Sequence, residues 1–577
     1  MISETGERRW VTVGADEAVV TRLAGEVGIP VQMARILVSR GMGDGDQAKA
    51  YLHPRLSQLS DPFLFPDMRK AVERIWRAIN GQEHIVVFGD YDADGVTSTA
   101  LLVTVLRELG AETRPFLPSR HTDGYGLTPA ALERCLEGQP FGLLVTVDCG
   151  TGSCEAVEQA TARGIDTIVT DHHEAARHVA PALAVINPKL AATETVGLLA
   201  GVGVVYKLCQ GLIAYGSEQG FATVEDCELR RHLDLVALGT VADVVPLVNE
   251  NRILVHHGLA LLNSGPRPGI VALNRVAGVR TTIDCYHLGF LIGPRLNAAG
   301  RLGDAAPALD LLLCKDHASA RRLAGKLDSF NRERKRIEEQ IIQEAVEMLV
   351  ADFDPDYEMG IVVGGEGWHI GAIGIVAARL CGRYHRPSIV ISFDEHGIGK
   401  ASCRSVEPVD IVTALADCED LLDSYGGHRM AAGLTVRKEN FAAFRERFNA
   451  ACLSQAGMDA LKPVIQVDGW LTLGEADQTL LASIEQLRPM GLGNPTPVWG
   501  VRGVTVVGSP RIVGKNHLKL TLASGASQCD AIAFGMAGRE VPAGPLDVLF
   551  HLQENNYLGR RSVQLNIKDF RAAQADD

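Results

Sequence analysis

Residues 84–99, HIVVFGDYDADGVTST, decide the fold of this chain. A short apolar run ends at Gly89 and is followed by three aspartates on alternate positions, Asp90, Asp92 and Asp94. Like charges so close together repel, so a cation is expected among them. An EF-hand also begins D-x-D-x-D-G, but it needs a preceding helix and a glutamate at position twelve, where this chain has Leu101. A solvated acidic turn is the remaining alternative, and partners elsewhere in the chain must decide.

Strand-like and helix-like segments alternate after this stretch. HIVVFGD (84–90), GLLVTVDCG (142–150) and IDTIVTDHH (165–173) are typical of buried strands, while TSTALLVTVLRELG (97–110) and SCEAVEQATARG (153–164) are typical of helices. This alternation predicts βαβ units with a parallel sheet, and the unbroken apolar strands predict a sheet covered on both faces.

The rest of the chain predicts four further regions around this α/β domain. The expected boundaries are an N-terminal helical lead (1–80), the parallel-sheet domain (81–270), a connecting region with a long helix (271–350), a smaller α/β domain (351–457) and a β-barrel domain (458–577). The barrel is predicted from five short strands, at 466–473, 501–508, 517–523, 529–535 and 562–570, and the OB-fold is one candidate.

The long helix is predicted over residues 321–349 from one apolar stripe. The stripe consists of Leu323, Leu327, Phe330, Ile337, Ile341, Ala345 and Met348, and Arg334 completes it. The basic residues of this segment, apart from Arg334, are Arg321, Arg322, Lys326, Arg332, Lys335 and Arg336. They form either a solvated face or a wall that faces nucleic acid, and the two readings are equally favoured.

Composition sets limits on the class of protein. The chain has 577 residues, too many for one core, and its net charge of −14 argues against bulk attraction to nucleic acid without excluding a local basic channel. Twelve cysteines without a C-x-x-C pair predict reduced thiols in a cytoplasmic protein rather than a zinc site. The longest apolar stretch, VGLLAGVGVVY (196–206), is too short to span a membrane, so no membrane association is expected.

Acidic and histidine residues follow each of the predicted strands. Asp148 follows the second strand, Asp171, His172 and His173 follow the third, and Asp243 ends a further apolar segment that we also expect to belong to this sheet. Because the carboxyl ends of parallel strands meet at one edge, these residues should meet the aspartates at 90–94. Carboxylates with imidazole and no thiolate favour Mg²⁺ or Mn²⁺, and so many acids favour two ions roughly 3.5–4 Å apart. The pattern therefore predicts hydrolysis of a phosphoester or a phosphoanhydride.

Small-residue segments with basic side chains predict phosphate-binding sites. They are GGHRMAAG (426–433) with His428, GPRLNAAGR (293–301) with Arg295 and Arg301, PSRHTDGYGL (118–127) with Arg120, and ASCRS (401–405) with Ser402 and Arg404. Glycine lets backbone amides approach a phosphate, and arginine forks match its oxygens. Tight turns and surface arginines are the alternative, and the shared context favours phosphate.

The ordered motifs resemble a known family. DYDADG, VTVDCG, TDHH and GTVADVVPL resemble the four motifs of the DHH phosphoesterases, and GGHRMAAG resembles their DHH-associated domain. The resemblance runs from about residue 50 to the end, and within the family it is greatest to exonucleases specific for single-stranded DNA. It implies Mn²⁺- or Mg²⁺-dependent 5′→3′ degradation to nucleotides in DNA repair and recombination. It also implies a monomer that works with single-strand-binding protein and a helicase.

The resemblance also implies roles for single residues. Metal-site residues would be Asp90, Asp92, Asp94, Asp148, His172 and Asp243, with Asp148 as the bridge and Asp90, like Asp171, just outside the ligand atoms. Asp148, His173, His428 and Arg295 would serve catalysis at the scissile phosphate. Arg120, Arg295, Arg301, Ser402, Arg404 and His428 would bind DNA, with Arg120, Ser402 and Arg404 at the 5′ end. Cys149 stands where the family frequently has asparagine.

Two other functions share these motifs. Pyrophosphatases and phosphodiesterases of small nucleotides are shorter or membrane-bound, and non-catalytic DNA-binding scaffolds have lost ligands that this chain keeps. In the barrel, Trp499, Phe534 and Tyr557 either stack on bases or pack in the core, and we expect at least two of them in the core.

Overall fold

The computed structural model describes residues 8–120, 122–124, 126–174, 178–191, 196–354, 357–557 and 560–573. The chain forms two compact units. The smaller unit comprises Met1–Val11 and Lys326–Ile465, and the larger comprises Thr12–Gly325 and Gln466–Asp577. Among the described residues, none of the helices combines the length and the apolar character needed to cross a membrane. The five domain boundaries expected from the sequence stay predictions.

A five-stranded parallel sheet forms the centre of the larger unit. The strand order is β3 (Thr113–Phe116), β2 (Ile85–Gly89), β4 (Leu143–Val147), β5 (Asp166–Thr170) and β6 (Ala184–Ile186). Gly89 pairs with Val147, and Val147 pairs with Thr170, so the last residues of three strands lie side by side. The predicted parallel sheet is confirmed, and the register brings the motifs that follow these strands to one edge.

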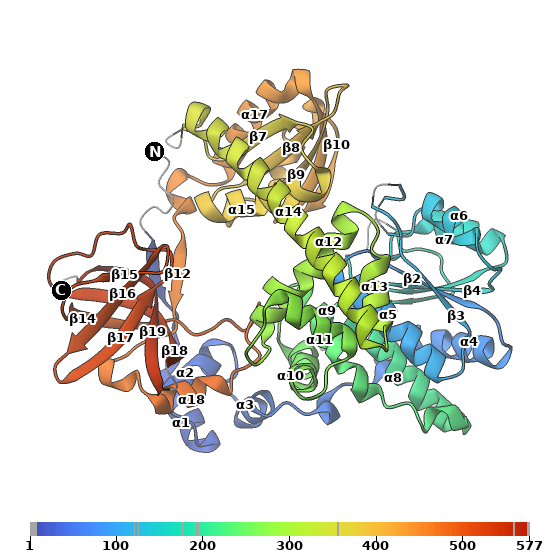
Figure 1. Cartoon of the computed structure of the whole chain (residues 1–577), viewed down its shortest axis with the longest axis horizontal. Helices are drawn as coiled ribbons and strands as arrows, with labels where there is room; N and C mark the ends of the chain where they lie inside the picture. Colours follow the sequence, from blue (N-terminus) through green and yellow to red (C-terminus); the bar gives the residue numbers. More distant parts are fainter. Residues whose placement is uncertain are drawn as a thin grey trace. The chain divides into compact units, whose positions relative to one another are not determined.

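Helices cover both faces of this sheet, as Figure 1 shows. Helices α6 (Pro129–Leu136) and α7 (Cys154–Ala162) pack on the face that carries Val86, Phe88 and Leu144. Helices α4 (Met68–Asn80), α5 (Ala93–Glu108) and α8 (Gly201–Gln219) lie on the other face. The two-sided cover explains why β2 and β4 are buried at every position.

One helix boundary and one predicted strand differ from the sequence prediction. Helix α5 begins at Ala93 rather than at residue 97, so Asp94 lies in its first turn. The expectation that Asp243 ends a strand of the sheet is wrong, because the residue caps the C-terminus of helix α9 (Leu233–Ala242). Nearly every residue of α9 is buried, and a helix buried all round has no amphipathic pattern that would distinguish it from a buried strand.

A further helical layer completes this part of the larger unit. It contains α10 (Asn249–Ser264), α11 (Pro268–Ala277), a π-helical turn η6 (His287–Ile292), α12 (Gly293–Leu302) and α13 (Ala306–Leu313). The turn η6 leads directly into α12, and both pack against α9. This layer therefore lies over the edge of the sheet that carries the acidic motifs.

The C-terminal barrel is built from seven strands. The order is β13 (Gly469–Trp470), β14 (Trp499–Val506), β18 (Leu546–Tyr557), β19 (Arg560–Ala572), β17 (Ser527–Ala533), β16 (His517–Ser524) and β15 (Arg511–Val513), and a pairing of β14 with β16 closes it. The predicted barrel is confirmed, and β15 and β18 are the strands that the sequence prediction missed.

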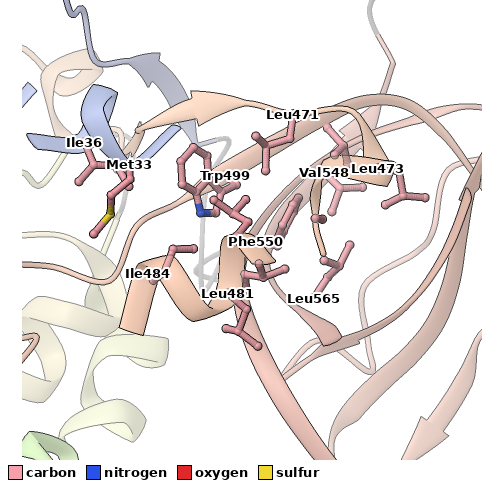
Figure 2. Packing of buried hydrophobic residues seen from close by; sticks show 14 of the residues in the cluster. Met33, Ile36, Leu471, Leu473, Leu481, Ile484, Trp499, Val548, Phe550 and Leu565 are labelled. Carbon is pink, nitrogen blue, oxygen red and sulfur yellow. The ribbon is translucent and has the colours of Figure 1, made fainter. Parts of the chain in front are cut away.

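The barrel shares its core with the N-terminal helices. Figure 2 shows Met33 and Ile36 of α2 (Val31–Ser39) and Ile484 of α18 (Gln478–Glu485) gathered near Trp499 and Phe550 of the barrel. Trp499 is thus a core residue, whereas Phe534 is half exposed. The side chain of Tyr557 lies outside the described part of the chain, so the expectation of two core aromatics stays a prediction.

The smaller unit contains a five-stranded mixed sheet. The order is β10 (Leu422–His428), β11 (Ala431–Arg437), β9 (Ile398–Arg404), β8 (Ser388–Phe393) and β7 (Ile361–Glu366), with only β7 and β8 parallel. Helices α15 (Ile370–Tyr384) and α17 (Phe441–Gln455) pack on it.

The long helix is α14 (His317–Asp352), as predicted. In the smaller unit Ile341, Ala345 and Leu349 join the core beside Trp368, so Leu349 takes the position that the stripe assigned to Met348, which is exposed. The six basic residues predicted for the other face are exposed.

Candidate metal centre

Four segments of the larger unit bring acids and histidines together at one edge of the parallel sheet. Potential ligand atoms form three groups, and within each group these atoms all lie within 4.8 Å of one another. The groups are Asp90 with Asp92 and Asp148, Asp94 with His172 and Asp243, and Asp148 with His172 and His173. The residues come from the β2–α5 connection, the ends of β4 and β5, and the end of α9. Sequence-distant residues thus form one compact cluster.

The three aspartates after β2 have different environments. Asp92 caps α5, and one of its oxygens accepts hydrogen bonds from the amides of Asp94 and Gly95. Asp94 is buried and accepts bonds from the amides of Gly201 and Val202, at 2.7 and 2.9 Å, in the first turn of α8. The positive end of α8 therefore compensates part of the Asp94 charge.

Asp148 occupies the middle of the cluster. Its backbone has a φ of 62°, a left-handed conformation that aspartate tolerates better than most residues, and its amide donates to the Thr170 carbonyl at 2.9 Å. Its Oδ1 atom lies 3.1 Å from His172 Nε2. The same nitrogen lies 3.5 Å from Asp243 Oδ2 and 3.9 Å from Asp94 Oδ2.

Asp171 fixes the positions of the two histidines by hydrogen bonds. One of its oxygens accepts hydrogen bonds from the amides of His172 and His173 and from the His173 ring at 2.8 Å, and the other accepts the Thr151 amide. Burial alone would raise the pKa of Asp171, but the bond and charge of His173 outweigh it and hold the pKa at about 2. Burial alone would lower the pKa of His173, but the hydrogen bond and the charge of Asp171 outweigh it and raise that pKa.

The unpaired atoms of the cluster test whether a divalent metal fits. Asp90 Oδ1, Asp148 Oδ1 and His172 Nε2 are buried, and none has a hydrogen-bond partner within the described residues. The 3.1 Å approach of the last two is therefore not an aligned hydrogen bond, and it suits two lone pairs aimed at one cation. Oxygen donors with one or two imidazoles are the donor set of Mn²⁺ and Mg²⁺, so the residues fit such an ion.

The pKa values of these groups show that their ionised forms are unfavourable in the fold without that cation. Burial, followed by the charge of Asp92, raises the pKa of Asp90 to about 8 and that of Asp94 to about 7. Burial and the charge of Asp94 raise the pKa of Asp243 to about 9 and that of Asp148 well above its ordinary value. Burial, with the nearby His173 charge, lowers the pKa of His172 to about 4, so its ring is neutral and ready to bind a metal. The cluster thus needs protons or cations to be stable.

The predicted anion-binding arginines of the larger unit differ in their surroundings. The guanidinium of Arg120 lies 5.5 Å from the ring centre of Tyr91, and the charge of Arg301 also acts on Tyr91. The charge of Arg120 also acts on Asp90. Arg295 is buried, and its guanidinium donates to the Leu291 carbonyl at 2.5 Å and to the Val276 carbonyl at 3.5 Å. Its role at the scissile phosphate stays a prediction.

The other predicted DNA-binding residues belong to the smaller unit. Arg404 on β9 and His428 on β10 both pair across to Ala431 of β11, so they lie at the same end of the sheet. Arg404 Nη1 donates to Ser402 Oγ at 3.2 Å, and burial lowers the pKa of this mostly buried guanidinium. His428 is exposed. The structure brings these three residues together within their own unit.

Several residues that support the centre were missed in the sequence. Asn297 Oδ1 accepts the Ala93 amide at 2.6 Å and so fixes the acidic loop. Asn187 donates to Thr151 Oγ1 and to the His173 carbonyl, at 2.8 and 2.9 Å. Asn297 lies inside GPRLNAAGR, which was singled out for its arginines, whereas nothing in the sequence around Asn187 marks it.

Gly201 offers a direct test of how tightly the centre is packed. A Cβ at this position would lie 2.5 Å from Asp148 Oδ1, and a buried aspartate cannot move away without losing its alignment with His172. We expect Gly201→Ala to weaken Mn²⁺ binding and metal-dependent activity by about 10- to 100-fold, as displaced supporting groups of metal sites do. Titration calorimetry with Mn²⁺ measures the effect.

A matched control is Gly25→Ala, because Gly25 also lies in a helix but a Cβ there would meet nothing within 4 Å. It should leave metal affinity unchanged. Equal affinity of the Gly201→Ala variant and the parent protein would show that Asp148 Oδ1 is not a ligand atom.

Domain families match three parts of the chain. Residues 84–240 match the DHH family N-terminal domain, residues 346–454 match the DHHA1 domain, and residues 467–569 match the RecJ OB domain. The first match covers the parallel sheet and all of the clustered acids except Asp243, and the other two cover the mixed sheet of the smaller unit and the barrel.

Relatives match nearly the whole of this chain. The chain is 35% identical to the single-stranded-DNA-specific exonuclease RecJ of Bacillus subtilis, over 97% of this chain and 70% of that protein. It is 38% identical to the protein of the same name from Dickeya dadantii, over 94% of this chain and 96% of that protein. Its structure is similar to the crystal structure of RecJ in complex with Mn²⁺ from Thermus thermophilus. That comparison gives a TM-score of 0.84 and 30% identity, and covers 99% of this chain and 80% of the other.

Proposed function

The chain belongs to the RecJ family of single-stranded-DNA-specific exonucleases, and from this premise we propose that the cluster around Asp148 is its hydrolytic centre. The protein is a hydrolase of single-stranded DNA, and its cofactor is Mn²⁺ or Mg²⁺. The observation that supports the proposal is the set of buried, unpaired ligand atoms on Asp90, Asp148 and His172, gathered from three segments of the chain.

Two ion positions follow from the ligand groups. We assign Asp90, Asp92 and Asp148 to one position and Asp94, His172 and Asp243 to the other, with Asp148 as the bridge because it also faces His172 at 3.1 Å. Bound there, the divalent ions supply a hydroxide nucleophile at neutral pH and positive charge for the phosphate oxygens.

The protein residues position the substrate for that chemistry. The ring of His173 is fixed by Asp171, and in our proposal it is directed to a phosphate oxygen. Arg120 and Arg301, both close to Tyr91, add positive charge beside the acidic loop. Because these charges are fixed before substrate arrives, the charge that develops in the transition state meets a preorganised site.

The direction of digestion requires a site for one end of the strand. We propose that Ser402 and Arg404 bind the 5′-terminal phosphate, so that the enzyme releases nucleotides in the 5′→3′ direction, while His428 serves the scissile phosphate. The support is local: Arg404 is mostly buried, is held by Ser402 Oγ, and lies level with His428 at one end of the sheet. A guanidinium with a hydroxyl beside it suits phosphate oxygens.

Membership of the family supports a proposal for the cellular setting. We propose a monomeric cytoplasmic enzyme that acts in DNA repair and recombination with single-strand-binding protein and a helicase. Its twelve cysteines are all free, which agrees with a reducing compartment. Co-purification from cells of these two partners with the tagged full chain, but not with an unrelated tagged protein, tests the assignment of partners.

Digestion of end-labelled DNA tests the proposed function. With Mn²⁺, a long 5′-labelled single strand should release labelled mononucleotides at once, a 3′-labelled strand should release label late, and blunt duplex should persist. Chelation should stop the reaction. If the single strand stays intact while pyrophosphate or dinucleotides are cleaved, the result would favour a phosphodiesterase of small substrates. If the protein binds the strand without cleaving any substrate, the result would favour a scaffold.

A further inference from the structure

Two aromatic side chains are stacked on each other in solvent next to the metal centre. Tyr286 and Phe290 are 58% and 68% exposed, and their ring centres are 5.2 Å apart with an angle of 26° between the planes. Exposing this much aromatic surface costs free energy that burial would recover. A stacked, exposed pair of this kind indicates a binding surface.

The segment that carries the pair packs beside the metal centre. Gly289 and Gly293 flank Phe290, and a Cβ on them would lie 3.7 Å from Val241 Cγ1 and 3.1 Å from Ala242 Cβ, respectively. Val241 and Ala242 immediately precede Asp243. The segment that carries the pair therefore packs on the last turn of α9, directly before a proposed ligand.

The same helical segment also reaches the acidic loop. Asn297, seven residues after Phe290, accepts the Ala93 amide between Asp92 and Asp94. At a rise of about 1.5 Å per residue, Phe290 lies roughly 10 Å along the helix from that contact. The aromatic pair is thus at a distance that a few nucleotides of an extended strand would cover.

Local contacts make this surface rigid. The ring of His287 lies edge-on to Tyr286, with centres 5.9 Å apart. Its Nδ1 is 2.6 Å from Asp284 Oδ1, and its Nε2 is 3.2 Å from Thr281 Oγ1. The fixed imidazole packs against the phenol ring of Tyr286. Little conformational freedom of that side chain therefore remains to be lost when a flat ligand binds.

The charge around the pair indicates the class of ligand. Residues 268–303, which contain it, hold four arginines and one aspartate, in a chain whose net charge is −14. The aspartate is Asp284, which is engaged by His287 and lies 3.6 Å from Arg488. Arg275 and Arg280 are exposed. Exposed aromatic faces on a segment that also exposes positive charge suit the bases and phosphates of a single strand.

We propose that Tyr286 and Phe290 form a base-stacking platform, which holds unpaired nucleotides of the strand whose end is in the metal centre. The proposal rests on the function proposed above and adds a determinant of its specificity. Bases in a duplex are already stacked and cannot offer their faces, so the platform selects single strands. It is also tolerant of sequence, because every base has an aromatic face.

The test compares DNA with and without bases. Binding of the full chain to a fluorescent single strand is measured by anisotropy in the presence of chelator, and a short abasic window is moved along the strand. The parent protein should lose about ten-fold in affinity when the window covers the platform. The double variant Tyr286→Ala/Phe290→Ala should bind the normal strand about ten-fold more weakly and lose nothing further at that window.

Control variants separate stacking from a structural role. Phe290→Trp should keep the parent affinity and the parent response to the window, and Tyr357→Ala, which removes another exposed aromatic side chain, should behave as the parent. With Mn²⁺, the double variant should raise KM about ten-fold and change kcat by less than about two-fold, because the metal centre is intact.

Three results would overturn the platform. The first is a double variant that binds the normal strand as tightly as the parent. The second is a double variant that loses as much affinity as the parent when the abasic window covers the platform. The third is a parent protein that is a dimer in sedimentation velocity and becomes a monomer in the double variant. The last result would assign the surface to a second copy of the chain. Since binding is measured without metal, a protein that fails to digest DNA would contradict the proposed function while leaving this comparison readable.

Discussion

Asp148→Ala is expected to lower the rate of single-strand hydrolysis by at least about 10³-fold, a loss of the size seen when a group that stabilises the transition state is removed. Asp148 belongs to two of the three ligand groups and lies 3.1 Å from His172 Nε2, so its removal damages both proposed ion positions. DNA affinity in chelator should change by less than about three-fold, because the binding surfaces outside the cluster remain. Initial rates on a 5′-labelled strand and anisotropy measure the two quantities.

The isosteric variant Asp148→Asn excludes loss of folding as the explanation. Burial and neighbouring acids raise the pKa of Asp148, so its ionised form is unfavourable in the metal-free fold. Without metal, Asp148→Asn should therefore unfold at a higher temperature than the parent, while it is equally inactive. Asp226→Ala, which removes an exposed aspartate, should keep full activity. Near-parent activity of either Asp148 variant would remove the bridge from the mechanism.

Arg404→Ala is expected to weaken binding of linear strands with a 5′-phosphate by about 10- to 100-fold, the value of one charge-assisted hydrogen bond to phosphate. Circular single strands have no end to place beside Ser402, so their affinity should change by no more than about three-fold. Competition between linear and circular DNA of equal length measures the ratio directly. The effect should be smaller for linear strands that end in a 5′-hydroxyl.

Arg437→Ala is the matched control for Arg404. Arg437 lies on β11 of the same sheet, is exposed, and pairs with Asp423 at 3.2 Å. This variant should bind linear and circular strands as the parent does, because an exposed ion pair contributes little. If Arg404→Ala weakens linear and circular strands to the same extent, Arg404 contributes general electrostatic affinity and does not recognise the 5′ end.

Much of the fold could be predicted because its signals are local. The apolar strands β2, β4 and β5 are each followed by an acid, and α14 shows a continuous stripe over many turns. The short strands β3 and β6 were missed, because four and three residues are too few to give a periodic signal. Helix α9 was misread for a different reason, because complete burial removes the pattern that identifies a helix.

The site was predictable where the sheet alone decides geometry. The paired ends of β2, β4 and β5 bring Asp148 and His172 to the acidic loop, which parallel topology requires. The contribution of Gly201 could not be predicted, since it depends on where the first turn of α8 packs. The bond from Asn297 to the acidic loop also depends on packing between segments that lie about 200 residues apart.

The central claim is a pair of divalent ions held by Asp148 and its neighbours. An anomalous difference map from crystals grown with Mn²⁺ tests it most directly. We expect two peaks roughly 3.5–4 Å apart, with Asp148 between them, Asp90 and Asp92 beside one, and Asp94, His172 and Asp243 beside the other. A map with no peak at this edge of the sheet, or with these side chains turned away from the peaks, would contradict the account.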